Sequence, residues 1–169
     1  VPAPTKTYTL CGTPLYLAPE VILNRGHNGG ADHWCLGVMI YEMLTGGNPF
    51  YNHDMDQVQL FTAIVKAQFE IPSSVSPVSN LLIHAFLQRN PSRRIGSLAK
   101  GEDDILEHPF FATIDFDKLR RKKIEPPMKP KIRNPLDTSN FDDWSHLQDK
   151  RKTKYPKLSE NEQSIFADF

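Results

Sequence analysis

The sequence has little of what secreted, metal-binding or membrane-spanning proteins need. Only two cysteines occur among 169 residues, Cys11 and Cys35, and no metal-ligand spacing surrounds them. They indicate neither a disulfide framework nor a metal site. No apolar run approaches the roughly 18 residues that cross a bilayer, and no signal peptide is visible. We therefore expect no membrane span and a reducing, cytoplasmic compartment.

A net charge is also missing. The 20 Lys and Arg residues balance 20 Asp and Glu residues, which argues against nucleic acid or an anionic membrane as a partner. Residues 1–114 carry 7 basic and 10 acidic groups, whereas residues 115–169 carry 13 and 10. The two parts should therefore differ in character. Because the chain opens with Val1 and not Met, we expect it to be a piece of something longer.

Sustained strand alternation is absent before residue 115, so the sequence predicts a mainly α domain. Proline and glycine interrupt residues 1–31, which should be mostly loop. Asp32 fits an N-cap, and the nearly all-apolar run that follows predicts a buried central helix ended by Gly46. The predicted helices cover residues 18–24, 33–44, 55–67, 78–88 and 102–108.

Two of these helices have a predicted inward face. Five residues form the stripe of the 55–67 helix: Met55, Val58, Phe61, Ile64 and Val65. Four residues form that of the 78–88 helix: Leu81, Leu82, Ala85 and Phe86. From residue 115 onwards the composition changes, and four prolines rule out a long helix through 126–135. This last segment cannot form its own core, so it either wraps a larger body or is disordered. Its basic clusters are most simply a solvated surface.

Four motifs then occur in order along the chain. Residues 9–20 (TLCGTPLYLAPE) look like the end of a kinase activation segment with its A-P-E signature. Residues 32–38 (DHWCLGV) resemble the start of the buried kinase helix. Residues 90–96 (NPSRRIG) resemble the late kinase arginine motif, and residues 108–111 (HPFF) the end of the catalytic domain. The chain thus resembles the C-terminal part of a protein kinase.

The tail narrows the resemblance. Residues 137–144 (DTSNFDDW) are similar to the C-terminal tail of AGC-group serine/threonine kinases, and the terminal F-x-x-F resembles that of the cyclic-nucleotide-dependent enzymes. Residues 23–27 and 44–46 lean towards the cyclic-GMP branch over the cyclic-AMP branch. The resemblance implies the end of the activation segment and substrate-binding loop at 1–31, a helical C-lobe at 32–114 and an AGC tail at 115–169. It implies no β-rich N-terminal lobe in this chain.

The resemblance assigns roles in the substrate-binding loop. Thr9 matches the activation-loop phosphorylation site, where phosphate would order the loop against arginines. Thr13 would support the catalytic base by bridging it to this loop. Leu10, Pro14 and Leu17 match the wall of the pocket for the residue after the phospho-acceptor. Without the resemblance, the two threonines are ordinary loop residues and the three apolar residues are local core.

The resemblance also assigns one specificity residue and several structural ones. Glu42 would receive a substrate Arg two residues before the acceptor; the alternatives are an internal ion pair or a side chain whose end reaches solvent. Glu20 and Arg94 would form a buried salt bridge. Asp32 would cap its helix and hold the catalytic loop, or serve as a cap and nothing more. Trp34 belongs to the motif of the buried helix and has a structural role.

The tail residues have implied roles outside the C-lobe. Phe141 would reach the adenine pocket, and Phe166 with Phe169 would fill a hydrophobic groove on the N-terminal lobe. Without the resemblance they are simply part of a mobile tail. Leu15 departs from the Glu often found at its position, which puts in doubt any preference for a more distant substrate Arg.

The chemical machinery of a kinase is missing from residues 1–169. The sequence has no Gly-rich loop over ATP, strand lysine, H-R-D or D-F-G. We expect ATP and Mg²⁺ in the full-length enzyme, none bound by this chain, and no phosphoryl transfer by it alone. Expected partners are basic peptides, the N-terminal lobe and a cyclic-nucleotide-binding domain or subunit. The alternatives are a non-catalytic peptide-binding module and a fragment with no stable fold.

Overall fold

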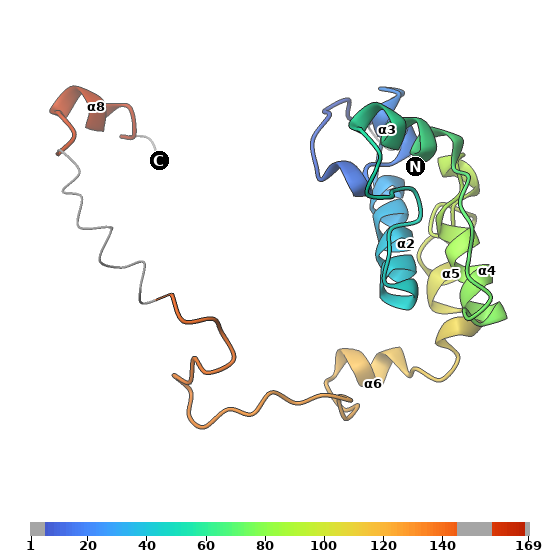
Figure 1. The fold of residues 1–169 in the computed structure, drawn as a ribbon. Helices are drawn as coiled ribbons and strands as arrows, with labels where there is room; N and C mark the ends of the chain where they lie inside the picture. The colour runs from blue at the N-terminus through green and yellow to red at the C-terminus, as the bar shows by residue number, and fades with distance from the viewer. Residues whose placement is uncertain (1–5, 145–156, 168–169) are drawn as a thin grey trace. The chain divides into compact units, whose positions relative to one another are not determined.

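The computed structural model describes residues 6–144 and 157–167. It divides into two units, one ending at Ile124 and the other beginning at Glu125. Every regular element of the described residues is helical (Figure 1), and a single isolated antiparallel bridge joins Thr7 to His27. The prediction of a mainly α fold is therefore confirmed. None of the described helices combines the length and apolarity needed to cross a bilayer.

The first unit contains nine short to medium helical elements among its described residues. They are η1 (Pro14–Tyr16), α1 (Pro19–Ile22), α2 (Gly30–Thr45), α3 (Gln57–Lys66), α4 (Pro77–Phe86), η2 (Pro91–Arg93), α5 (Asp103–Leu106), η3 (Pro109–Phe111) and α6 (Phe116–Arg120).

The central helix α2 begins earlier than the sequence predicts. Its N-cap is Gly29, and the Asn28 side chain accepts a hydrogen bond from the Gly30 amide at 3.1 Å. Because that amide is already satisfied, the helix starts at Gly30, and the prediction of Asp32 as N-cap is wrong. Asp32 lies in the first turn, where its carboxylate interacts favourably with the helix dipole. The predicted end is confirmed, since Gly46 takes a left-handed φ of 80° and caps the helix.

One side of α2 forms the core, and it packs against α4; the two helices run side by side in Figure 1. Trp34 and Val38 are fully buried. A Cβ on Gly37 would lie 2.6 Å from the Phe86 Cβ, so glycine permits the close approach. The sequence predicted burial on most sides of this helix, but part of its apolar surface is open, and Met43 is 69% exposed. Met39 and Leu44 are exposed as well.

The inward faces of α3 and α4 are rotated from their predicted positions. In α3, Leu60 and Ile64 are buried four residues apart, whereas Val58 is 73% exposed. A capping box between Asp56 and Gln59 fixes where α3 starts. In α4, Leu82, Ile83 and Phe86 are buried, and Leu81 is 64% exposed. The predictions for Val58 and Leu81 are therefore wrong, because adjacent apolar residues leave the phase of a helix undecided.

The second unit has little buried surface among its described residues. Its one described helix, α8 (Glu160–Ser164), starts with a capping box between Ser159 and Glu162. No helix crosses residues 126–135, as their prolines predicted. Asp137 organises the turn that follows, because its carboxylate accepts from the amides of Arg133 at 2.8 Å and Ser139 at 3.0 Å. These bonds, that from Arg133 first, lower the pKa of Asp137.

Candidate functional site

A buried ion pair joins the A-P-E signature to the late arginine motif. Arg94 donates to both carboxylate oxygens of Glu20, at 2.7 and 3.1 Å, across 74 positions of sequence. The side chains are 0% and 6% exposed. Arg94 also donates to the carbonyl oxygens of Gly30 and Gln88, which makes five hydrogen bonds in all. The guanidinium therefore has the partners that a buried charge requires.

Aromatic packing completes this centre. Trp34 of α2 lies with its ring centroid 5.2 Å from the Arg94 guanidinium carbon, a cation–π arrangement. Trp34 also stacks on Phe50, with the ring centroids 5.3 Å apart. The loop that carries Arg94 is held by Asn90, which caps η2 through the Ser92 amide, and by the Ile95 amide, which donates to the Ala85 carbonyl at 2.9 Å. Arg94 thus fixes the loop after α4 against α1, through Glu20, and against the start of α2, through Gly30.

The loop before α1 presents its polar residues to solvent. Thr9 and Thr13 are exposed, and Thr13 forms the N-cap of η1 without a side-chain cap bond. The bridge between Thr7 and His27 anchors the segment, with backbone bonds of 3.0 and 2.9 Å. Gly12, at a φ of 123°, allows a turn that other residues rarely adopt.

The three predicted apolar wall residues do not share one environment. Leu10 is 62% exposed and Pro14 is exposed, whereas Leu17 is 8% exposed and belongs to the core cluster. Only Leu10 and Pro14 therefore offer open apolar surface to a peptide. Leu17 supports the loop from beneath.

Glu42 is held by two neutral donors. The Tyr16 hydroxyl donates to one carboxylate oxygen, and the Asn48 side-chain amide donates to the other at 2.9 Å. Asn48 is itself fixed, because it accepts from the Phe50 amide at 3.0 Å. Glu42 is half-buried, and no cation pairs with it among residues 6–144 and 157–167. The two hydrogen bonds fix the position of the carboxylate.

Two side chains near this carboxylate, Tyr16 and Cys35, have shifted pKa values. The hydrogen bond to Glu42 is the main cause that raises the pKa of the Tyr16 hydroxyl, with burial and the carboxylate charge adding to it. Cys35 donates its thiol hydrogen to the Tyr16 carbonyl at 3.2 Å, and burial raises the pKa of that thiol. Tyr16 therefore stays a hydrogen-bond donor, and Cys35 is not an activated thiolate.

Tyr16 and Asn48 are the site residues that the sequence analysis missed. They lie 26 positions before and 6 positions after Glu42, and no periodicity links the three. The one local signal is Gly46, which ends α2 and turns the chain so that Asn48 comes back beside Glu42.

The remaining predicted site residues are not gathered here. Asp32 is exposed, and its carboxylate makes no hydrogen bond within the part of the chain that is described. Phe141 is 76% exposed and Phe166 is 59% exposed, both in the second unit. Phe169 lies outside the described residues.

Comparison with known proteins decides the family. The family model described as "Protein kinase domain" matches residues 1–111. The chain belongs to the protein kinase family. The kinase chain is 43% identical over 137 residues to ribosomal protein S6 kinase 2 beta of Xenopus laevis, covering 81% of the chain and 22% of that protein. It is 44% identical to ribosomal protein S6 kinase 2 alpha of Gallus gallus, covering 81% of the chain and 18% of that protein.

Ribosomal protein S6 kinase alpha-1 of Homo sapiens gives a similar match, with 43% identity over 81% of the kinase chain and 18% of that protein. The chain thus spans about a fifth of the length of the curated relatives it matches. The family implies ATP and Mg²⁺ in the full enzyme. Within the described residues, no group of three or more His, Cys, Asp or Glu side chains is placed to hold a metal ion.

Proposed function

We propose that the chain is the substrate-binding part of the C-lobe, with its tail, of an AGC-group serine/threonine kinase that phosphorylates basic peptides. The kinase family match and the ribosomal S6 kinase relatives support the group. Control by a cyclic nucleotide, which the tail favoured, has no support among those relatives. We therefore assign the chain to the AGC group without naming a branch, and we propose that the kinase is cytoplasmic.

The observation that carries the proposal is that the Glu42 carboxylate is half-buried and has no cationic partner among the described residues. A half-buried carboxylate without a cationic partner is costly, unless a ligand supplies the cation. Tyr16 and Asn48 fix the two oxygens, so an incoming guanidinium meets a preorganised acceptor. The exposed Leu10 and Pro14 provide apolar surface for a neighbouring substrate residue.

Other residues keep their proposed roles in the full-length enzyme. Thr9 is exposed and accessible to a phosphorylating kinase. Thr13 and the free carboxylate of Asp32 would contact the catalytic loop, and the phenylalanines of the tail would dock on the N-terminal lobe. ATP would supply the γ-phosphoryl group, which the catalytic residues of the rest of the kinase would transfer.

A binding experiment tests the role of Glu42. Fluorescence anisotropy of the 169-residue chain should show tighter binding of a peptide with Arg two residues before Ser than of its Ala twin. Glu42→Gln should weaken binding of the Arg peptide about tenfold or more, because a charge-assisted hydrogen bond is lost. Glu102→Gln makes the same change at an exposed site and should leave the affinity unchanged. Equal affinity for the two peptides would refute the assignment.

A non-catalytic binding module remains the second candidate, because residues 1–169 contain neither H-R-D nor D-F-G. Both candidates predict peptide binding by this chain. They differ in the protein from which it comes: the kinase binds ATP and carries D-F-G and H-R-D ahead of Thr9, and the module does neither. The upstream coding sequence and an ATP-binding measurement on the full-length protein separate them.

A further inference from the structure

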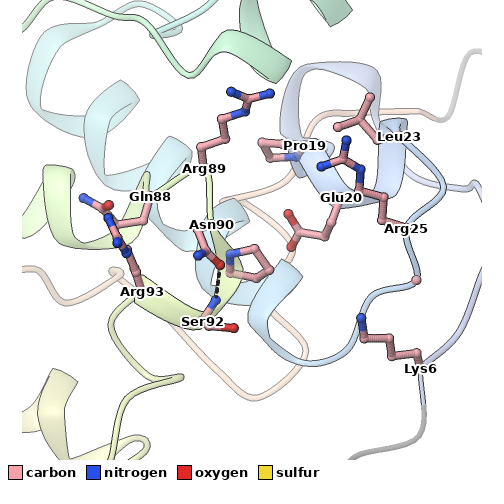
Figure 2. A pocket seen from close by; sticks show the side chains of 12 residues that line it. Lys6, Pro19, Glu20, Leu23, Arg25, Gln88, Arg89, Asn90, Ser92 and Arg93 are labelled. Carbon is pink, nitrogen blue, oxygen red and sulfur yellow. Dashed lines mark hydrogen bonds between the residues drawn. The ribbon is translucent and has the colours of Figure 1, made fainter.

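A cavity of about 690 Å³ lies on the first unit. Glu42 is not among the residues that line it, and the lining differs from the Glu42 site in composition and charge. Its walls come from two segments, residues 19–26, which include α1, and residues 88–93, which include η2, and Lys6 adds to the lining. Figure 2 shows Arg89 and Arg93 on one wall, with Arg25 and Lys6 across from them. The cavity therefore brings together cations from three separate parts of the sequence.

The lining is strongly positive. Lys6, Arg25, Arg89 and Arg93 are all exposed, and their side chains make no hydrogen bond or ion pair with the described residues. Glu20 is the one acidic residue of the lining, and Arg94 already engages both of its oxygens. Four like charges around one cavity repel each other, and a bound anion would relieve that repulsion.

The backbone that carries Lys6, Arg89 and Arg93 is anchored by its neighbours. Arg93 precedes the buried Arg94, and Arg89 precedes Asn90, which caps the η2 turn. Lys6 precedes Thr7, whose backbone bridges to His27. A second cavity of about 180 Å³ shares Lys6 and Ser92 with the first and extends to His27. The two cavities together form a groove and not an isolated pit.

The chemistry of the lining favours a phosphate carried on a peptide. Three of the four cations are arginines, whose planar guanidinium matches two phosphate oxygens at once. Leu23 and Pro91 add apolar surface for residues that flank the phosphate. Among the described residues that line the larger cavity, none is Phe, Tyr or Trp, which favours a phosphopeptide over a nucleotide or nucleic acid, whose bases stack on aromatic rings. The volume leaves room for more than one phosphate group.

We propose that the groove between residues 19–26 and 88–93 is a docking site for a phosphorylated peptide segment, with Arg25, Arg89 and Arg93 as the phosphate ligands. This site is separate from the acidic site at Glu42, which would take the opposite charge. It does not depend on the proposed substrate specificity.

Isothermal titration calorimetry of the 169-residue chain tests the proposal. The probes are a phosphoserine peptide without Lys or Arg, its unphosphorylated twin and inorganic phosphate. The phosphopeptide should bind at least about tenfold more tightly than either of the others. Equal affinity for the two peptides would overturn the proposal. Equal affinity for phosphopeptide and inorganic phosphate would overturn the assignment to a peptide.

Variants locate the binding. Arg89→Gln with Arg93→Gln should weaken phosphopeptide binding by about 10- to 100-fold, since two charge-assisted contacts are lost. Arg121→Gln with Lys123→Gln removes the same charge outside the cavity and should leave the affinity unchanged. Arg25→Gln, on the opposite wall, gives an independent test if the first variant loses its cooperative thermal transition. Unchanged binding in folded Arg89→Gln/Arg93→Gln or Arg25→Gln, or an equal loss in the control, would overturn the site.

Discussion

The hydroxyl of Tyr16 donates a hydrogen bond to the carboxylate of Glu42, from a loop before α1 to the last turns of α2. The contact ties the segment that carries Thr9 and Thr13 to the helix at the centre of the unit. It also leaves the carboxylate charge without a cation in the described residues. One hydrogen bond thus ties the loop to α2 and fixes one oxygen of the carboxylate.

The first prediction concerns the titration of Tyr16. Its raised pKa means that the hydrogen bond stabilises the fold fully below pH 10.0, and that this contribution is lost as the pH rises through the folded-state pKa. Glu42→Gln removes the negative acceptor, so the pKa of Tyr16 should fall towards 10.0. An NMR titration of the Tyr16 ring measures it. Tyr8, exposed in its loop, is the internal control, and an unchanged Tyr16 titration would contradict the assignment.

The second prediction concerns the buried ion pair. Glu20→Gln leaves the Arg94 charge buried and half-paired, so it should lower the free energy of unfolding by about 3–5 kcal/mol. Urea denaturation of the 169-residue chain measures the change.

The matched control for that pair is exposed. Lys100 and Glu107 form an ion pair with side chains 59% and 60% exposed. Glu107→Gln should cost no more than about 1 kcal/mol, because water screens both charges. Similar losses in the two variants would show that burial does not govern the Glu20–Arg94 pair. A chain without any cooperative transition would support the hypothesis of a fragment with no stable fold.

The third prediction concerns the close approach of α2 to α4. Gly37→Ala places a Cβ 2.6 Å from the Phe86 Cβ and 2.9 Å from a Leu87 methyl group, so the two helices must separate. The variant should lose about 1–3 kcal/mol of stability. Gly47→Ala is the control, since its Cβ would meet nothing within 4 Å. Thermal denaturation compares the two variants, and an equally stable Gly37→Ala would refute the packing described here.

The fourth prediction concerns the turn around Asp137. Its pKa is lowered chiefly by the Arg133 amide, so the turn is stabilised above pH 3.8 and loses that contribution as the pH falls through the folded-state pKa. The NMR shifts of the Arg133 and Ser139 amides should change together in that acidic window. In Asp137→Asn they should show no such titration. Amide shifts that ignore pH in the wild-type chain would contradict the hydrogen bonds to Asp137.

Several features could be read from the residues alone. The absence of strand alternation predicted the helical fold, Gly46 predicted the end of α2, and the prolines of 126–135 excluded a helix there. The order of four motifs indicated the kinase family, which the match over residues 1–111 establishes. These signals are local, because φ preferences, caps and short motifs act within a few residues.

Other features could not be read in this way. Asn28 moved the start of α2 to Gly30, and packing against α4 and α1 selected which apolar residues turn inwards. Leu81 and Val58 are exposed although their neighbours are buried. A run of adjacent apolar residues fits several helix phases, and only the partner surface chooses among them.

The sequence by itself determined that the described residues are helical, that no helix crosses residues 126–135, and which family the chain belongs to. Tertiary structure alone decided that Tyr16 and Asn48 hold Glu42, and that Lys6, Arg25, Arg89 and Arg93 surround one cavity. The physical reason is distance along the chain. Hydrogen bonds and charge clusters join residues whose separation is set by the path of loops, and no local periodicity encodes that path.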